Sequence, residues 1–329
     1  MEQEARTSWL WASLILEAKS NVFDSPFEMP TLDQEAQPQN DSAPSESGAR
    51  HLSPSSLATP ALPLPTTAPE APTAPSPVAA ASSTATRPSS FLRLGTGGGT
   101  QTMGQMAEYV SRILEKQFIL FFFTIFICNN HAWLLRWDRA GVVVSEPFNF
   151  FEQPHLLHRF IYRFACLDDA QRGRDLTVSF ASQEEVRLVR SFQGKLTDWQ
   201  QEQFKAAFKM NYPVYRVDVP QDDVISAADL KAGRKVPREQ PNSSSGQTRR
   251  FLVGRPYFTG DSVVGRGTRG HIAYDVLDGR LVFCKEYWRL DVPSHHPEGE
   301  TLMELHSKGV QFIATPIVAG DVRSSDRLH

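Results

Sequence analysis

The sequence predicts an α+β fold that follows a long N-terminal tail, and three observations lead to this prediction. Residues 1–103 contain most of the prolines and almost no periodic pattern. From residue 104 on, apolar residues recur at helical spacing in some segments and alternate in others. Near the C-terminus, a glycine loop lies between two strand-like runs. A mixed set of helices and strands of this kind is typical of an α+β protein.

Composition limits the classes of function. A length of 329 residues allows one large domain or two small ones. The formal net charge of −3 gives no global basic field, so we expect no nucleic-acid partner. The three cysteines form no CxxC pair, which argues against a disulfide framework and against a zinc site. Their use fits a reducing compartment, and we expect an intracellular protein, cytoplasmic or nuclear.

The predicted tail covers residues 1–103. Its stretch from Asn21 to Thr100 is rich in Pro, Ser, Thr and Ala, which bury too little apolar surface to offset backbone ordering, so we expect disorder. The segment from Trp9 to Leu16 could form a short amphipathic helix, but no neighbouring segment offers a face for it. The first residues include two acidic side chains and lack a small-residue cleavage site, which argues against a secretory signal.

Residues 104–220 form a predicted α+β block. It begins with an amphipathic helix that ends near Lys116, and an almost wholly apolar run of eleven residues, 118–128, follows. That run is shorter than the about 20 residues of a membrane-spanning helix, so we interpret it as a buried strand and expect no membrane partner. Two strands flank a turn at Asp138–Gly141. Arg136, Asp138 and Arg139 could form a binding cluster, but charges of the turn and the sheet surface are the favoured interpretation.

Three helices and one strand complete the predicted block. A helical stripe follows Pro154, Ser182 and Glu185 form a capping box that opens a second helix, and residues 199–210 give a third. The alternating run 214–219 predicts a strand. His155 and His158 lie three residues apart, but no further metal ligands accompany them, so we assign no metal ligand in the chain. A polar, basic linker, residues 221–250, separates the block from the segment 251–329.

The glycine loop belongs to the segment VVGRGTRGHIAYDVLDGRLVFCKEY and contains Gly265, Gly267 and Gly270. A lone GxGxxG is weak evidence, because two classes of nucleotide site use it. In a dinucleotide fold the glycines open a helix. Here the alternating run HIAYDV follows and closes at an Asp-Gly turn, which leaves no room for a crossover helix. The context therefore excludes a dinucleotide site.

The order of elements favours a site of the protein-kinase type, in which a glycine loop, a strand lysine and a helix glutamate hold a nucleotide. Lys285 ends the run VFCK, twenty residues beyond Gly265, and a helix begins near Pro297. Glu298 is the favoured partner of Lys285, because Leu302 and Leu305 form a stripe on its face of the helix. Glu300 is the second candidate, rotated by about 200° around the helix. Residues 313–322 predict one more strand.

Several segments resemble the fungal-type protein kinase family. They are LLRWDRAGVVVSEPF, RGTRGHIAYDV, RLVFCKEYWR, HPEGETLMELHSKGV and IATPIVAGDV. The resemblance covers 105–323 and implies a protein-kinase-like N-lobe, with an antiparallel sheet and one helix, after a family-specific α+β block. It implies a serine/threonine-type kinase that uses ATP and Mg²⁺. The implied cofactor-binding residues are the loop glycines Gly265, Gly267 and Gly270, the phosphate-binding lysine Lys285, and its ion-pair partner Glu298 or Glu300.

The sequence departs from the kinase pattern in one respect. It contains neither an H-R-D-L-x-x-x-N segment nor a D-F-G segment, which supply the catalytic base and the metal ligands. We therefore assign no catalytic residue and no metal ligand, and expect a truncated fungal-type kinase that is inactive alone. The alternative is a non-catalytic, pseudokinase-like binding module. The protein substrate stays open, and the block 104–220 is a candidate partner-binding region.

Overall fold

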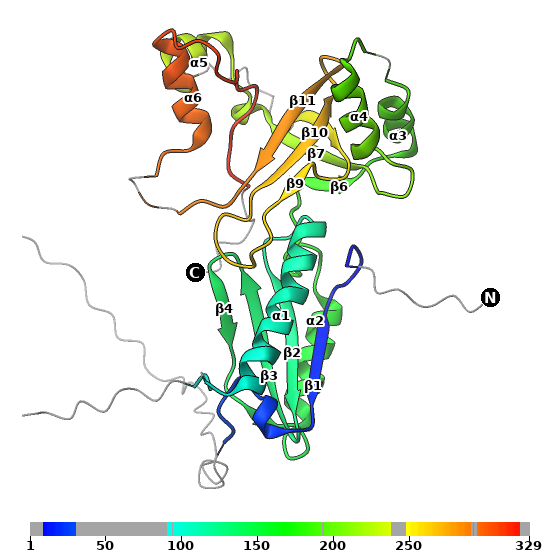
Figure 1. The fold of residues 1–329 in the computed structure, drawn as a ribbon, viewed down its shortest axis with the longest axis vertical. Coiled ribbons are helices and arrows are strands. Elements are labelled where there is room, and N and C mark those ends of the chain that lie inside the picture. The colour runs from blue at the N-terminus through cyan, green and yellow to red at the C-terminus, as the bar shows by residue number, and fades with distance from the viewer. Residues whose placement is uncertain are drawn as a thin grey trace, which may run out of the picture. The chain divides into compact units, whose positions relative to one another are not determined.

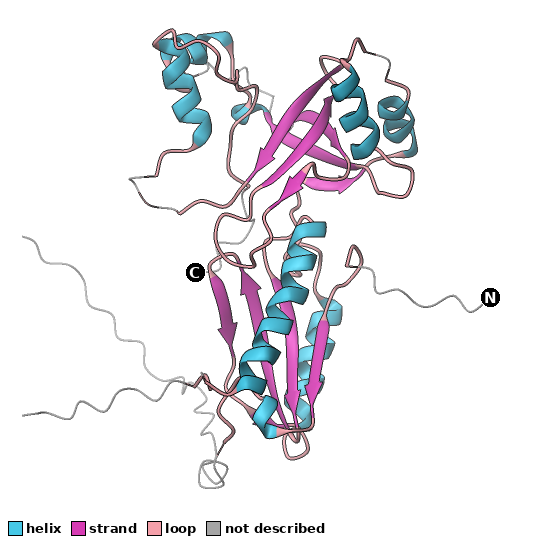
Figure 2. Cartoon of the chain, in the orientation of Figure 1, coloured by secondary structure: helices cyan, strands magenta, loops and turns pink. Residues whose placement is uncertain are grey.

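The computed structural model describes residues 9–30, 91–93, 95–192, 194–237, 248–290, 292 and 295–322 (Figures 1 and 2). The described residues form helices and two sheets, which confirms the predicted α+β class. The helices are α1 (Gly97–Lys116), α2 (Pro154–Cys166), α3 (Gln183–Arg190), α4 (Asp198–Ala207), α5 (Ala227–Ala232) and α6 (Glu298–Ser307). The strands of the first sheet are β1 (Ile15–Lys19), β2 (Phe122–Cys128), β3 (His131–Asp138), β4 (Gly141–Val144) and β5 (Phe148–Asn149). Those of the second are β6 (Val178–Phe180), β7 (Tyr215–Pro220), β8 (Thr248–Val253), β9 (Phe258–Thr259), β10 (Arg269–Asp275) and β11 (Arg280–Glu286).

The first sheet has the strand order β1-β2-β3-β4, and β5 pairs with β3. Helix α1 lies against one face and α2 against the other (Figure 1). The face under α1 carries a core of aromatic and aliphatic side chains, with Phe126 and Trp133 buried beside Met106 and Ile113 of the helix. On the opposite face, Phe123 contacts two phenylalanine rings of α2. The prediction that the apolar run 118–128 contains a buried strand is confirmed by β2.

Strand β1 lies in the segment that the sequence placed in the tail. The helix that the sequence left possible over Trp9–Leu16 does not form, and Ile15–Lys19 pairs with β2 in parallel. The edge of β2 opposite β3 offers backbone hydrogen bonds, and β1 takes them. The side-chain amide of Gln117 fixes the segment further, because it donates to the carbonyls of Trp9 (2.7 Å) and Ala12 (2.9 Å). Residues 31–90 of the predicted tail lie outside the described residues.

Helix α1 begins seven residues before the expected start at Gly104. The additional turns contain Gly97–Gly99, which carry no apolar pattern. Gly98 lies against the turn Val22–Asp24 and Gly99 against Ser25, so a Cβ atom on either glycine would meet the backbone of that segment. The start of α1 therefore depends on a contact with a distant segment of the chain.

The second sheet has the order β11-β10-β8-β7-β6, with β9 paired to β10. Strands β10 and β11 agree with the sequence prediction, including their turn at Asp278–Gly279. Strand β8 was not expected, since it begins at Thr248 inside the predicted linker and pairs with β10. The expected boundary at residue 220 does not match a boundary between sheets, since β6 and β7 come from the block 104–220 and join this sheet. Helices α3 and α4 start at capping boxes, the first of them the predicted Ser182–Glu185 pair.

The predicted linker is partly structured. Its residues 221–237 contain α5, which packs against α6 and begins at a capping box formed by Ser226 and Asp229. Residues 238–247 lie outside the described residues. The strand expected over 313–322 is wrong: this segment forms a single bridge, between Val318 and Val224 of the linker. The segment is held by the linker instead of by a sheet edge.

A membrane-spanning helix is not found in the part of the chain that the structure describes, because no helix there is both long and apolar enough.

Candidate functional site

The glycine loop comprises residues 260–268 and connects β9 to β10. Gly265 and Gly267 have φ angles of +94° and +47°, in the left-handed region that favours glycine. Val263 and Val264, which directly precede the first glycine of the pattern, lie within the loop, and β9 precedes it. The loop is therefore longer than the glycine pattern alone indicates.

Gly270, the third glycine of the pattern, belongs to β10 and pairs with Lys285 of β11. A Cβ atom at this position would meet the rings of Phe258 and Phe283. These two rings stack with 6.2 Å between their centroids, and they are 42% and 54% exposed. Because paired residues share a face of the sheet, the aromatic pair lies on the same face as the Lys285 side chain. The sequence analysis did not single out this pair, although Phe283 is part of VFCK.

Lys285 and Glu298 form an ion pair between the Nζ and Oε2 atoms. Tyr287 supports both partners: its hydroxyl accepts a hydrogen bond from the Glu298 amide (3.0 Å), and its ring centroid lies 5.3 Å from the Lys285 ammonium. Glu298 is the first residue of α6, whereas Glu300 is exposed and points elsewhere on the helix. Of the two candidates, Glu298 is thus the one that reaches the lysine.

The Lys285–Glu298 pair is open to solvent, with 37% and 43% of the two side chains exposed. An ion pair at this exposure contributes about 0–1 kcal/mol to stability. The pair therefore orients an ammonium group that a ligand can reach, and contributes little to holding the fold.

Helix α6 presents a different stripe from the predicted one. Gly299 and Met303 are its buried residues, whereas Leu302 and Leu305 are half-buried. The reason is its neighbour: α6 packs against α5, and a Cβ at Gly299 would meet the side chain of Ala319.

The opposite face of β10 is buried and polar. Arg269 donates to the carbonyl of Gln117 (2.7 Å), pairs with Glu286, and lies 4.3 Å above the ring of Phe118. His271 lies on the same face with its Nδ1 atom 3.2 Å from the Gly254 carbonyl. Burial, together with the nearby Arg269 charge, lowers the pKa of His271 to about 4, so the imidazole is neutral at pH 7. These buried polar contacts therefore hold β10 on the side of the sheet opposite to Lys285.

Arg139 corrects the interpretation of the charged turn after β3. Arg136 and Asp138 pair at 3.3 Å and are partly exposed, as expected of surface charges. Arg139 is only 6% exposed, and its guanidinium donates to the carbonyl of Ser262 in the glycine loop. Its interpretation as a surface charge is wrong, because the glycine loop covers it.

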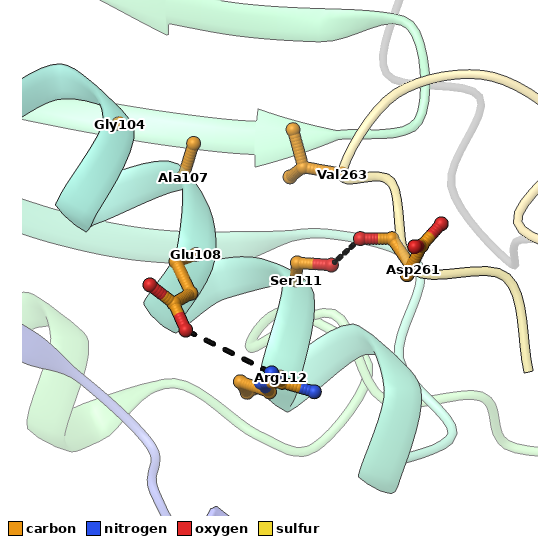
Figure 3. Close-up of a pocket in the computed structure, with 7 residues that line it drawn as sticks. All are labelled: Gly104, Ala107, Glu108, Ser111, Arg112, Asp261 and Val263. Carbon is orange, nitrogen blue, oxygen red and sulfur yellow. Dashed lines mark hydrogen bonds and ion pairs between the residues drawn. The ribbon is translucent and has the colours of Figure 1, made fainter.

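A pocket of about 360 Å³ lies between α1 and the start of the glycine loop (Figure 3). The hydroxyl of Ser111 donates to the carbonyl of Asp261 across it (2.7 Å). None of the six residues implied as cofactor-binding lines this pocket. Its lining residues are Gly104, Ala107, Glu108, Ser111, Arg112, Asp261 and Val263.

Metal ligands do not cluster in the described ranges, where no group of three or more His, Cys, Asp or Glu side chains could hold an ion. His155 and His158 are exposed on α2. The family resemblance implies Mg²⁺, but the described side chains around Lys285 offer no ligand set for it.

Comparison with known proteins gives one family match. The family model described as fungal protein kinase matches residues 95–328. A search of curated proteins finds no match, and neither does a search of solved structures.

Proposed function

The chain belongs to the fungal protein kinase family, and we propose that it serves ATP-dependent phosphoryl transfer by holding the nucleotide phosphates at Lys285. The glycine loop would cover the phosphates. Lys285 would neutralise the α- and β-phosphates as a point charge, oriented by Glu298.

The observation that carries this proposal is the Lys285–Glu298 ion pair opposite Gly270. Lys285 is placed by β11 and Glu298 by the first turn of α6, and the two residues are 13 positions apart. The Tyr287 hydroxyl fixes the start of the helix by accepting from its first amide. An ammonium group held in this way, and still accessible, suits a phosphate ligand better than a purely structural role.

Phosphoryl transfer itself needs more than the glycine loop, Lys285 and Glu298, which together we call the half-site. It requires a base that accepts the proton of the substrate hydroxyl and metal ligands that bridge the phosphates. We assign neither role to a residue of this chain, and we propose that these 329 residues bind ATP without transferring its γ-phosphoryl group. We propose transfer to a serine or threonine only for a kinase that has this half-site together with a catalytic base and metal ligands.

The alternative is a pseudokinase-like module that binds a protein through the same face. The exposed Phe258–Phe283 pair favours it, because apolar rings next to Lys285 also suit a protein partner. The two proposals differ in their need for nucleotide.

Calorimetric titration of the chain with ATP tests the proposal. We expect binding that weakens at least about tenfold in Lys285→Ala, because a charge-assisted contact to phosphate is lost. Lys308→Ala is the matched control, since Lys308 is also on the surface and pairs with Glu304 within α6. Equal affinities of the two variants, or no heat at millimolar ATP, would contradict the proposed half-site and leave the binding-module alternative.

A further inference from the structure

We infer that Arg139 is a positioning residue for the glycine loop, which it ties to the first sheet together with Ser111 of α1. We call these two residues the loop clasp. The proposal assigns a role to the turn between β3 and β4 that neither the family match nor the half-site at Lys285 requires.

The contacts between Arg139 and the loop run in both directions. The guanidinium donates to the carbonyls of Ser262 and Val263, the second at 3.4 Å. In return, the Gly265 amide donates to the Arg139 carbonyl (2.8 Å). Backbone and side chain of one residue thus hold three of the four loop positions from 262 to 265, and a change in the loop's path would break all of these bonds together.

Gly267 adds a steric contact to these hydrogen bonds. A Cβ atom on Gly267 would fall on the Arg139 guanidinium, so the loop backbone lies directly against this group. The second glycine of the pattern therefore has a reason in this structure apart from any nucleotide: it lets the loop approach the clasp.

The start of the loop is held by α1. Ser111 donates to the Asp261 carbonyl (2.7 Å), and Val263 packs against the core of the first sheet. Figure 3 shows Val263 facing Ala107 of the helix, with Ser111 directed at Asp261. The hydrogen bond of Ser111 and the packing of Val263 therefore both hold the start of the loop against α1 and the first sheet.

Burial gives Arg139 a strong preference for the docked loop. The guanidinium is closed off from water, and within the described residues it forms no ion pair with a carboxylate. Its acceptors are the two loop carbonyls and the carbonyl of Leu114 at the end of α1 (3.5 Å). Burial and the nearby Arg269 lower the pKa of Arg139. A buried charge needs its acceptors, so departure of the loop is unfavourable unless water replaces them.

The consequence concerns the block before the glycine loop. Its first sheet and α1 set the position of the loop 260–268, which leads into β10, where Gly270 pairs with Lys285. An effect of the clasp on nucleotide binding rests on the proposed function, whereas the docking of the loop does not.

Hydrogen–deuterium exchange of the full chain, read by mass spectrometry, tests the clasp. In Arg139→Ala, we expect peptides covering 260–268 to exchange at least about tenfold faster, because the Gly265 amide and its neighbours lose their protection. Peptides of β2, β3 and β11 should exchange as in the parent chain. Arg136→Ala is the matched control: it removes an arginine of β3, three residues before Arg139, that pairs with Asp138 and lies over the Phe121 ring instead of touching the loop.

Two outcomes would overturn the inference. One is an unchanged loop in a folded Arg139→Ala chain. The other is faster exchange throughout the first sheet, which would indicate a purely structural arginine. Arg139→Lys should restore part of the protection, because the ammonium can still donate to loop carbonyls.

A second variant keeps the test decisive if Arg139→Ala does not fold. Ser111→Ala removes one hydroxyl from α1, and we expect about threefold faster exchange confined to the loop. Loop exchange equal to that of the parent chain in Ser111→Ala would also overturn the clasp. ATP titration of the same variants is a separate measurement: without ATP binding in the parent chain, the proposed function fails while the exchange result stands.

Discussion

The two sheets of the molecule bury different kinds of side chain. Beneath α1, the first sheet buries mainly large apolar groups, among them Phe126, Trp133 and Leu135. In the second sheet, one strand buries Arg269, His271 and Asp275, each at most 4% exposed. Apolar groups gain stability from burial alone, whereas buried charges require specific partners. The first sheet is thus suited to be a rigid support, and the second to fix particular groups at particular positions.

The largest effect should come from the apolar core of the first sheet. Trp133 is 2% exposed and contacts the rings of Phe27 and Phe126 at centroid distances of 5.4 and 5.5 Å. We expect Trp133→Ala to lower the free energy of unfolding by about 4 kcal/mol, through lost transfer energy and a cavity. Chemical denaturation measures this loss. Trp199→Ala is the control, because Trp199 of α4 is 57% exposed; a similar cost for both would show that burial in the core of the first sheet does not carry the effect.

An intermediate effect should come from the buried histidine of the second sheet, and it should depend on pH. The folded pKa of His271 is about 4, below the ordinary value of 6.5, so the unfolded chain binds the proton more tightly. Stability is therefore full above pH 6.5 and falls as the pH decreases toward 4. Between pH 7 and pH 5 we expect a loss of about 2 kcal/mol from this group.

Denaturation of His271→Phe at both pH values isolates this contribution. The phenylalanine ring can keep the stacking on Phe118 but cannot titrate. The variant should lose less stability than the parent chain between pH 7 and pH 5. An identical pH dependence in the two proteins would show that the buried imidazole does not carry the effect.

The smallest effect on stability, and the most informative for function, should come from the exposed ion pair between β11 of the second sheet and α6. Glu298→Gln weakens an ion pair that is open to solvent, so the free energy of unfolding should change by less than about 1 kcal/mol. The affinity for ATP should fall nonetheless, because Lys285 loses its orienting partner. Glu300→Gln serves as the matched control in the same calorimetric titration. Equal affinities of the two variants would remove the functional assignment of the pair.

Much of the second sheet could be predicted from the sequence, because local signals agree there. Alternation in HIAYDV, the Asp-Gly turn and the run VFCK specify β10 and β11 without help from distant segments. The helix after Pro297 and its Glu298 follow from the same local order. The backbone pairing of β10 with β11 then places Gly270 opposite Lys285.

The remaining features depend on contacts between distant segments. Strand β1 forms on an edge of β2 more than 100 positions away, and its own residues carry only a weak pattern. Arg139 has the appearance of a turn charge until the loop at Ser262 covers it. The buried stripe of α6 differs from the predicted one because α5, its neighbour, comes from a segment with the composition of a linker. Local periodicity contains no information on such neighbours.

The position of β1 also changes the topology of the N-terminal region. Met29 and Leu92 delimit a stretch whose flanks meet, because Phe27 bridges to Leu92 and the Arg93 amide donates to the Pro26 carbonyl (2.9 Å). The proline-rich stretch is thus an insertion closed at both ends instead of a free terminus. Closing such a loop costs only about 0.6 kcal/mol more for each doubling of its length. Evolution can lengthen or shorten it at little cost to the sheet, and a single cut within it leaves β1 to be held by its pairing with β2.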